Sequence, residues 1–211
     1  MTSREERQPH RIAVLASGEG SNMAALADAA AAGKIPARVE LVLSDVAGAP
    51  VLQRAAGRGL EARHLDPGAS RHRLDGPAEA AYVRALRERA ITLVCLAGFM
   101  RILGPAFLEA FPQAILNVHP SLLPAFPGLG AVRQALAYGV RVTGATVHFA
   151  AREVDAGPVV LQEAVAVLPG DTEESLTRRV HQAEHRIYPE AAALFCEGRL
   201  RLEGRWVRIL P

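Results

Sequence analysis

The residues best suited to chemistry are an amide, an imidazole and a carboxyl group on two separate segments. Asn117 and His119 lie in the run Asn-Val-His-Pro-Ser-Leu-Leu-Pro, and Asp155 lies in Val-Asp-Ala-Gly-Pro. The apolar residues 114–116 predict a short buried strand, so Asn117 and His119, two residues apart, share one face. The amide can stabilise a developing negative charge, the imidazole can move a proton near neutral pH, and Asp155 can orient it. For an isolated Asn-x-His, a turn cap and a surface histidine are the alternative.

A glycine-rich turn, Gly18-Glu19-Gly20-Ser21-Asn22, joins the first predicted strand to an alanine-rich helix. Glycines let the backbone approach a ligand, and a helix N-terminus offers free N–H groups, so a phosphate monoester is the expected guest. A dinucleotide site is one alternative, because Asp45 follows the second predicted strand, although Met23 stands where a third glycine is needed. A plain strand–helix turn is the other.

The elements that position these motifs alternate between strand and helix. Strands are predicted at residues 11–16, 39–43, 62–65 and 91–97, and helices at 21–32, 49–57 and 78–89. This order predicts an α/β fold with a single doubly wound, mostly parallel, Rossmann-like sheet. An antiparallel C-terminal part is expected after Pro158: a strand at 159–168, a helix to about 186, a second helix begun by Pro189, and a hairpin around Gly204. We expect one domain over residues 11–202 and a disordered extension at 1–10.

Composition narrows the class of protein. The 211 residues are 50% hydrophobic and carry a formal net charge of +2, without a long run of Lys and Arg, so we expect no nucleic-acid partner. Two cysteines provide neither a disulfide framework nor zinc-ligand spacing, and we expect no metal. Without an apolar signal segment or membrane span, we expect a cytoplasmic protein acting on small molecules, as a monomer or weak homodimer.

Taken together and in order, the motifs resemble those of the folate-dependent formyltransferases, in particular the group that formylates glycinamide ribonucleotide. The similarity runs from about residue 11 to about residue 202. The motifs that carry it are Leu15 to Asn22, Leu96 to Leu103, Asn117 to Pro124, Thr146 to Phe149, Val154 to Pro158, and Ala183-Glu184-His185.

The resemblance implies transfer of a formyl group from 10-formyltetrahydrofolate to the glycyl amine of 5'-phosphoribosylglycinamide, a step of purine biosynthesis, without a metal. It implies catalytic roles for Asn117, His119 and Asp155. The ribonucleotide is expected at Gly20, Ser21, Asn22, His181, Gln182, Ala183 and Glu184. The folate is expected at Met100, Arg101, Ile102, Leu103, Asn117, Ala151, Arg152, Glu153, Val154 and Asp155, with Arg73 favoured over Arg71 at its glutamate tail.

Some positions depart from the family. The loop at 122–142, expected to be mobile, carries Ala125, Gly130 and Val132 where some relatives have Lys or His, and His148 is interpreted as supporting core. Three alternatives stay open: a formyltetrahydrofolate hydrolase, a methionyl-tRNA formyltransferase, and a nucleotide-binding module without chemistry. The first two would need an extra N-terminal and an extra basic C-terminal domain, respectively, and neither is expected here.

Overall fold

The computed structural model describes residues 9–211, and a seven-stranded sheet forms its centre. The sheet order is β3-β2-β1-β5-β7-β8-β9, with the first five strands parallel and β8 and β9 antiparallel to their neighbours. These strands are β1 His10–Leu15, β2 Ala37–Ser44, β3 Ala62–His64, β5 Leu93–Leu96, β7 Ile115–His119, β8 Val142–Phe149 and β9 Val159–Ala166. The predicted fold class is confirmed.

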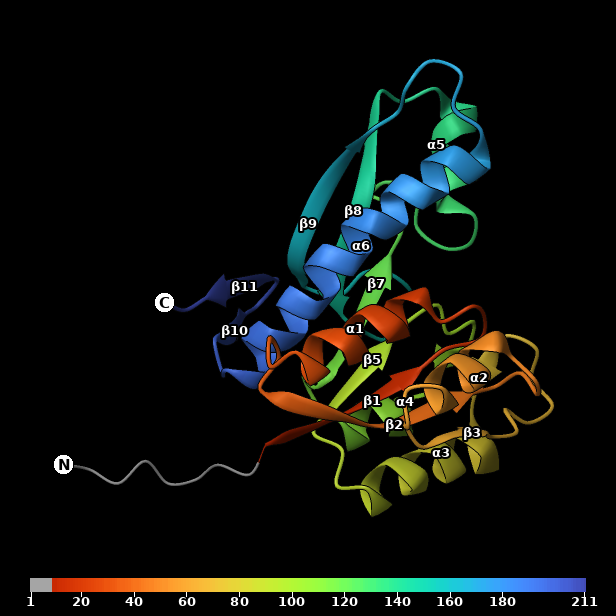
Figure 1. The fold of residues 1–211 in the computed structure, drawn as a ribbon, viewed down its shortest axis with the longest axis vertical. Helices are drawn as coiled ribbons and strands as arrows, with labels where there is room; N and C mark the ends of the chain where they lie inside the picture. Colours follow the sequence, from red (N-terminus) through yellow and green to blue (C-terminus); the bar gives the residue numbers. More distant parts are fainter. Residues whose placement is uncertain (1–8) are drawn as a thin grey trace.

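Two small ladders lie outside the main sheet. One pairs β4 Arg73–Leu74 with β6 Ile102–Leu103, and the other pairs β10 Leu200–Glu203 with β11 Trp206–Ile209. The second is the hairpin that the sequence predicts around Gly204, and Figure 1 shows it projecting beside the lower end of α6. The first was not predicted, because two residues are too short for a periodic pattern.

Helices cover both faces of the main sheet. They are α1 Ser21–Ala31, α2 Pro50–Ala56, α3 Gly76–Glu88, α4 Pro105–Ala110, α5 Ala131–Tyr138 and α6 Glu173–Cys196. Successive residues of β1 enter different cores: Ile12 and Val14 pack with residues of α1 and α6, whereas Ala13 and Leu15 pack with residues of α3 and α4. This apolar strand buried on both faces is typical of a parallel sheet. In Figure 1, α1 and α6 lie together in front of the sheet.

The C-terminal helix is where the prediction of two helices is wrong. Helix α6 runs without interruption from Glu173 to Cys196 and contains Pro189. Proline lacks an N–H and clashes with the preceding turn, at a cost of about 3 kcal/mol in a helix interior. Buried side chains on both sides of it, Tyr188 and Ala191 among them, pack in the core and hold the helix together. Tertiary packing therefore outweighs the local signal.

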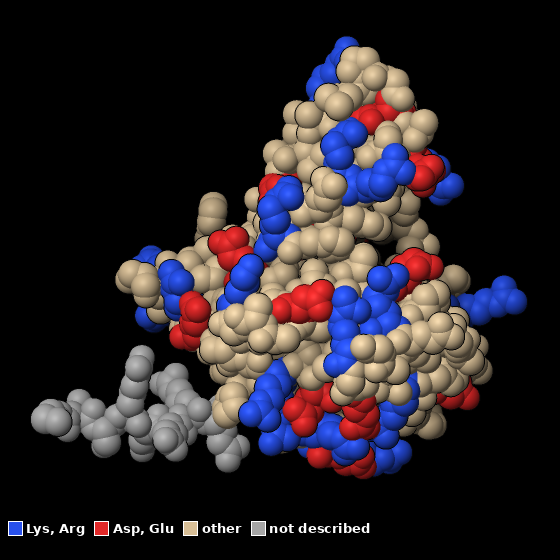
Figure 2. Space-filling model, viewed as in Figure 1, with Lys and Arg blue, Asp and Glu red and all other residues tan. Residues whose placement is uncertain are grey.

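The predicted disordered extension at residues 1–10 can be compared with the structure only in its last two residues. Residues 1–8 of the predicted extension lie outside the described residues, whereas His10 already belongs to β1 and pairs with Ala37. Across the face seen in Figure 2, Lys and Arg lie close to Asp and Glu, without a field of one sign. Within residues 9–211, no helix combines the length and apolar character that crossing a membrane requires.

Candidate active site

A cavity of about 680 Å³ opens where β5 stops in the middle of the sheet. The last residue of β5, Leu96, pairs with Asn117, so β7 continues to His119 without a neighbour on that side. Segments that follow β1, β5 and β7 meet there, as expected for the carboxyl ends of parallel strands. The predicted site residues in the cavity wall are Gly20, Ser21, Asn22, Met100, Arg101, Ile102, Leu103, Asn117, His119, Ala151, Glu153, Val154, Asp155, His181 and Glu184.

The three candidate catalytic side chains are in contact at the centre of this cavity. Nδ1 of His119 lies 3.3 Å from Oδ2 of Asp155. The Asn117 amide nitrogen lies 3.1 Å from Nε2 of His148 and 3.5 Å from Oδ1 of Asp155. His119 and His148 are only 5% and 2% exposed, so these polar contacts form in a largely dry environment where they are stronger.

The loop after β7 folds back over the same side chains. Nε2 of His119 lies 2.8 Å from the carbonyl oxygen of Phe126, and the Gly128 amide donates to Oδ2 of Asp155 at 2.8 Å. Because a carbonyl oxygen can only accept, Nε2 carries the hydrogen in its contact with Phe126, while Nδ1 faces the Asp155 carboxylate. With a second hydrogen on Nδ1, the ring would form an ion pair with that carboxylate.

Asp155 stays ionised although it is largely buried. Burial alone would raise its pKa, but the contact with His148, the hydrogen bond from the Gly128 amide and the attraction of His119 together lower the pKa. Its backbone has a φ of 53°, a left-handed conformation that is rare outside glycine and is often found at functional sites. Two residues later, a Cβ on Gly157 would lie 1.7 Å from the Phe149 carbonyl, so only glycine lets the loop return so closely to β8.

The glycine-rich turn forms one end of the cavity, at the N-terminus of α1. Gly20 adopts a φ of 76°, and Ser21 and Asn22 begin the helix, where unpaired N–H groups attract anions. Behind them the Asn22 amide donates to Oε2 of Glu184 at 2.7 Å. Burial raises the pKa of Glu184 to about 7, despite the opposing hydrogen bond from Asn22. Oδ1 of Asn22 is buried without a hydrogen-bond partner, so this atom can accept one hydrogen bond from a ligand.

The other end of the cavity is a slot between two chain segments. Residues 98–103 follow β5 on one side, and residues 150–155 of the β8–β9 connection lie on the other. Met100 on one wall and Val154 on the other are 54% and 50% exposed, so both offer apolar surface to a flat molecule in the slot. The walls thus pair apolar side chains with polar backbone.

Comparison with known proteins shows the family to which the chain belongs. The sequence model described as "Formyl transferase" matches residues 10–192. The chain belongs to the formyl transferase family. The family resemblance inferred from the motifs is therefore confirmed.

Several proteins are similar to this formyl transferase family member over most of its length. The phosphoribosylglycinamide formyltransferase of Escherichia coli is 44% identical over 195 residues, which make up 90% of this chain and 89% of that protein. The human trifunctional purine biosynthetic protein adenosine-3 is 44% identical over 197 residues; these cover 93% of this chain but only 19% of that longer protein. The crystal structure of glycinamide ribonucleotide transformylase 1 from Symbiobacterium toebii superposes with a TM-score of 0.93 at 52% identity and covers 99% of this chain and 100% of that one.

Four predicted residues of this family member lie outside the cavity wall: Arg73, Arg152, Gln182 and Ala183. Ala183 is fully buried in the core, and Gln182 is exposed on α6 next to His181, which does reach the cavity. Near the predicted folate tail, His72 lines the cavity in place of its neighbour Arg73. Adjacent residues of an extended segment point to opposite sides, so a shift of one position exchanges them.

His148 is the site residue that sequence reasoning undervalued. It pairs with Asn117 across β7 and β8, so its side chain stands beside the Asn117 amide. Its Nδ1 lies 2.9 Å from the Phe149 carbonyl, and its Nε2 lies 3.1 Å from the Asn117 amide nitrogen and 3.6 Å from Oδ1 of Asp155. The hydrophobic residues Val147 and Phe149 on either side suggested core, but a polar residue alternating with them faces the cavity.

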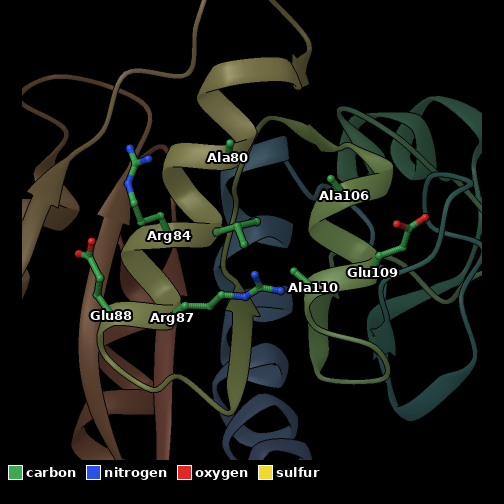
Figure 3. Close-up of a pocket in the computed structure, with 8 residues that line it drawn as sticks. Ala80, Arg84, Arg87, Glu88, Ala106, Glu109 and Ala110 are labelled. Carbon is green, nitrogen blue, oxygen red and sulfur yellow. The ribbon is translucent and has the colours of Figure 1, made fainter.

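A second hollow of about 560 Å³ lies between α3 and α4 and has a different character. Its charged residues are Arg84, Arg87, Glu88 and Glu109, all exposed. Figure 3 shows Arg87 reaching across toward α4, whereas Arg84 and Glu88 point away from it. A hollow without a buried polar group offers nothing to orient a ligand. Throughout residues 9–211, no three His, Cys, Asp or Glu side chains are grouped closely enough to hold a metal ion.

Proposed function

We propose that the chain transfers a formyl group from 10-formyltetrahydrofolate to the glycyl amine of 5'-phosphoribosylglycinamide, in the biosynthesis of purines. The observation that carries this proposal is that Asn117, His119 and Asp155 are in contact and line one cavity together with a helix N-terminus and an apolar slot. An anionic ligand and a flat apolar ligand bound in this cavity would meet at these side chains. The names of the closely similar full-length relatives support the same reaction.

The ribonucleotide is the ligand proposed for the glycine-rich end. The backbone N–H groups of Gly20, Ser21 and Asn22 suit a phosphate, which also gains from the helix dipole. Glu184 and the unpaired Oδ1 of Asn22 suit the hydroxyl groups of a ribose, because both can accept hydrogen bonds. His181 lies beside them, with Nε2 3.9 Å from Oε2 of Glu184.

The folate is the ligand proposed for the slot. Met100, Ile102 and Val154 would cover its ring faces, while backbone groups of residues 98–103 and 150–155 would meet its polar edge. Bound there, the folate supplies the formyl group. His72, at the cavity wall, is our revised candidate for contact with the glutamate tail in place of Arg73.

The proposed chemistry uses charge and proton transfer alone. As the amine nitrogen bonds to the formyl carbon, the formyl oxygen gains negative charge. The Asn117 amide nitrogen lies 3.1 Å from Nε2 of His148 and donates to Oδ1 of Asp155 at 3.5 Å. The long contact with Asp155 would give way as the amide donates to the formyl oxygen, and the imidazolium form of His119 would add attraction. His119 then passes its proton to the folate nitrogen as the bond from that nitrogen to the formyl carbon breaks, and the proton lost by the attacking amine returns His119 to the imidazolium form. The Phe126 carbonyl must release Nε2 if that nitrogen is the donor.

Asp155 would hold His119 in the charged form. Its lowered pKa keeps it ionised at neutral pH, and a carboxylate 3.3 Å from Nδ1 stabilises the imidazolium. His148 would act one step further out, by fixing which way the Asn117 amide points. Two reactants held on either side of these groups avoid much of the entropic barrier of a bimolecular reaction.

We further propose that the enzyme works in the cytoplasm, as a monomer or weak homodimer, on small molecules alone. The interspersed charges and the unremarkable net charge of +2 support this. Analytical ultracentrifugation at several concentrations, with and without both ligands, tests the oligomeric state; a stable tetramer would contradict it.

The activity is tested by following the absorbance change on loss of the formyl group from 10-formyltetrahydrofolate. We expect rapid deformylation only when glycinamide ribonucleotide is present, with formylated ribonucleotide as the product by mass spectrometry. Equal rates without the ribonucleotide, with formate as the product, would instead identify a hydrolase. If both ligands bind and no reaction follows, the protein would be a binding module without chemistry.

A further inference from the structure

Arg101 lies in the segment that forms one wall of the slot, and its side chain bonds to two groups of the protein. Its Nε donates to Oδ2 of Asp45 at 2.7 Å, and its Nη1 donates to the Ser70 carbonyl at 2.5 Å. The side chains of Arg101 and Asp45 are 16% and 2% exposed, so the pair is shielded from water. The guanidinium is therefore engaged within the protein.

The second carboxylate oxygen of Asp45 reaches the other ligand loop. Ser17, which directly precedes the glycine-rich turn, donates its hydroxyl hydrogen to Oδ1 of Asp45 at 2.5 Å. The same hydroxyl oxygen accepts the backbone N–H of Met100 at 2.8 Å, and the Ser17 amide donates to the Gly98 carbonyl at 3.0 Å. One buried carboxylate at the end of β2 thus ties together the segments that follow β1 and β5.

These contacts fix the segment at three successive places. Gly98 is held through its carbonyl, Met100 through its amide and Arg101 through its side chain. The next residue, Ile102, continues the ladder with its amide bonded to the His72 carbonyl at 2.9 Å. A short loop with this many directional anchors is held in one conformation, and Met100 is thereby presented to the cavity.

We infer that Asp45 is a positioning residue for the folate: through Ser17 and Arg101 it holds residues 98–102 in the conformation that binds the pterin ring. This inference rests on the proposed function, since it assigns the slot to the folate. It also explains why Asp45 cannot serve a dinucleotide ribose, as the alternative interpretation required. Both of its oxygens are already used inside the protein.

Removing the charge of Asp45 should release the segment without changing the chemical step. In Asp45→Asn, the carbonyl oxygen can still accept from Ser17, but Arg101 loses its ionic partner at a site from which water is largely excluded. If the segment then holds its binding conformation about a tenth of the time, the apparent Kd for the folate rises about tenfold. At saturating folate, kcat should be unchanged, because bound folate restores the conformation.

The experiment compares Asp45→Asn, Arg101→Lys and the double variant with wild type. Calorimetric titration with tetrahydrofolate and with glycinamide ribonucleotide gives two separate affinities, and thermal unfolding of each ligand-free variant gives Tm. Arg101→Lys keeps the charge but cannot reach Asp45 and Ser70 together, so an intermediate loss of folate affinity is expected. In the double variant the losses should be less than additive, since both changes break one network.

Asp171 provides a matched control far from the cavity wall. Like Asp45 it is buried at its side chain and accepts from one serine and one arginine, Ser175 and Arg179. Asp171→Asn should lower Tm without a selective loss of folate affinity. The inference is overturned if Asp45→Asn leaves folate affinity unchanged, or if both ligands weaken alike. If the wild-type protein does not bind tetrahydrofolate at all, the proposed function itself is refuted.

Discussion

Replacement of Ser21 by aspartate adds a negative charge to the glycine-rich turn without changing the backbone conformation of the turn. Ser21 is the first residue of α1, so a carboxylate there lies at the positive end of the helix dipole and should stabilise the helix by about 0.3–1 kcal/mol. A phosphate bound to the N–H groups of the same turn would lie about 4–8 Å from that carboxylate. At an effective dielectric constant of about 20, the repulsion is about 2–4 kcal/mol per pair of unit charges. This corresponds to a loss of about 30- to 1000-fold in affinity for the ribonucleotide.

The choice of Ser21 rests on the geometry of its neighbour. A side chain at Gly20 would place Cβ 2.5 Å from Cγ2 of Val51 and would have to adopt a φ of 76°, so any substitution there damages the fold first. Ser21→Ala is the matched control, because it removes the hydroxyl without adding charge and should cost less than about tenfold.

The assay is calorimetric titration of each variant with glycinamide ribonucleotide and with tetrahydrofolate, together with Tm in the absence of ligand. We expect Ser21→Asp to keep or slightly raise its Tm and to keep its folate affinity, while ribonucleotide affinity falls. An unchanged ribonucleotide affinity in the folded variant would refute the assignment of the phosphate to this turn. Loss of both affinities with a lower Tm would refute the claim that helix α1 tolerates the carboxylate.

Three further outcomes follow from named contacts. His119→Ala should lower kcat by about a hundredfold or more with little change in the Kd of either ligand, measured by steady-state kinetics and calorimetry, because it removes the proton donor; near-normal turnover would exclude His119 from the mechanism. Burial raises the pKa of Glu184 from its ordinary range near 4.5 to about 7, so its contribution to stability is complete below pH 4.5 and is lost as pH rises through 7. Glu184→Gln should therefore gain up to about 3 kcal/mol over wild type at pH 8.5 and almost nothing at pH 4, with weaker ribonucleotide binding; equal Tm differences at both pH values would contradict the burial of a charged group there. Gly104→Ala would place Cβ 2.4 Å from Oε1 of Glu79 and break its 2.7 Å hydrogen bond from the Phe107 amide, which should cost about 1–3 kcal/mol in chemical denaturation; an unchanged midpoint would show that α3 and α4 adjust freely.

Much of the fold could be predicted because its signals are local. A continuous apolar run such as residues 93–96 in β5 indicates a strand that is buried on both faces. The glycine at position 20 indicates a tight turn, because it can adopt a positive φ. Each of these signals acts within a few residues. Pro189 is equally local, yet its prediction was wrong, because the packing of α6 depends on side chains that come from distant strands. Local preference decides an element only when tertiary contacts do not oppose it.

The site residues likewise fall into those that local sequence predicts and those that depend on tertiary contacts. Asn117, His119 and Asp155 could be named from their types and spacing, and the structure brings them together. The direction of a side chain could not be predicted: Arg101 has the charge expected of a ligand contact but turns to Asp45, 56 residues earlier in the chain. His148 could have been found from strand pairing, since it stands opposite Asn117, but that register exists only once β8 is placed against β7.

The C-terminal hairpin gives the chain an unusual optical property. Trp206 is the single tryptophan of the sequence, and it lies 80% exposed on β11, outside the main sheet. Its neighbour Arg205 reaches the carbonyl of Ala156 at 3.4 Å, directly after Asp155. Intrinsic tryptophan emission therefore reports on an exposed side chain of the hairpin and says little about the opening of the core. Unfolding is better followed by circular dichroism.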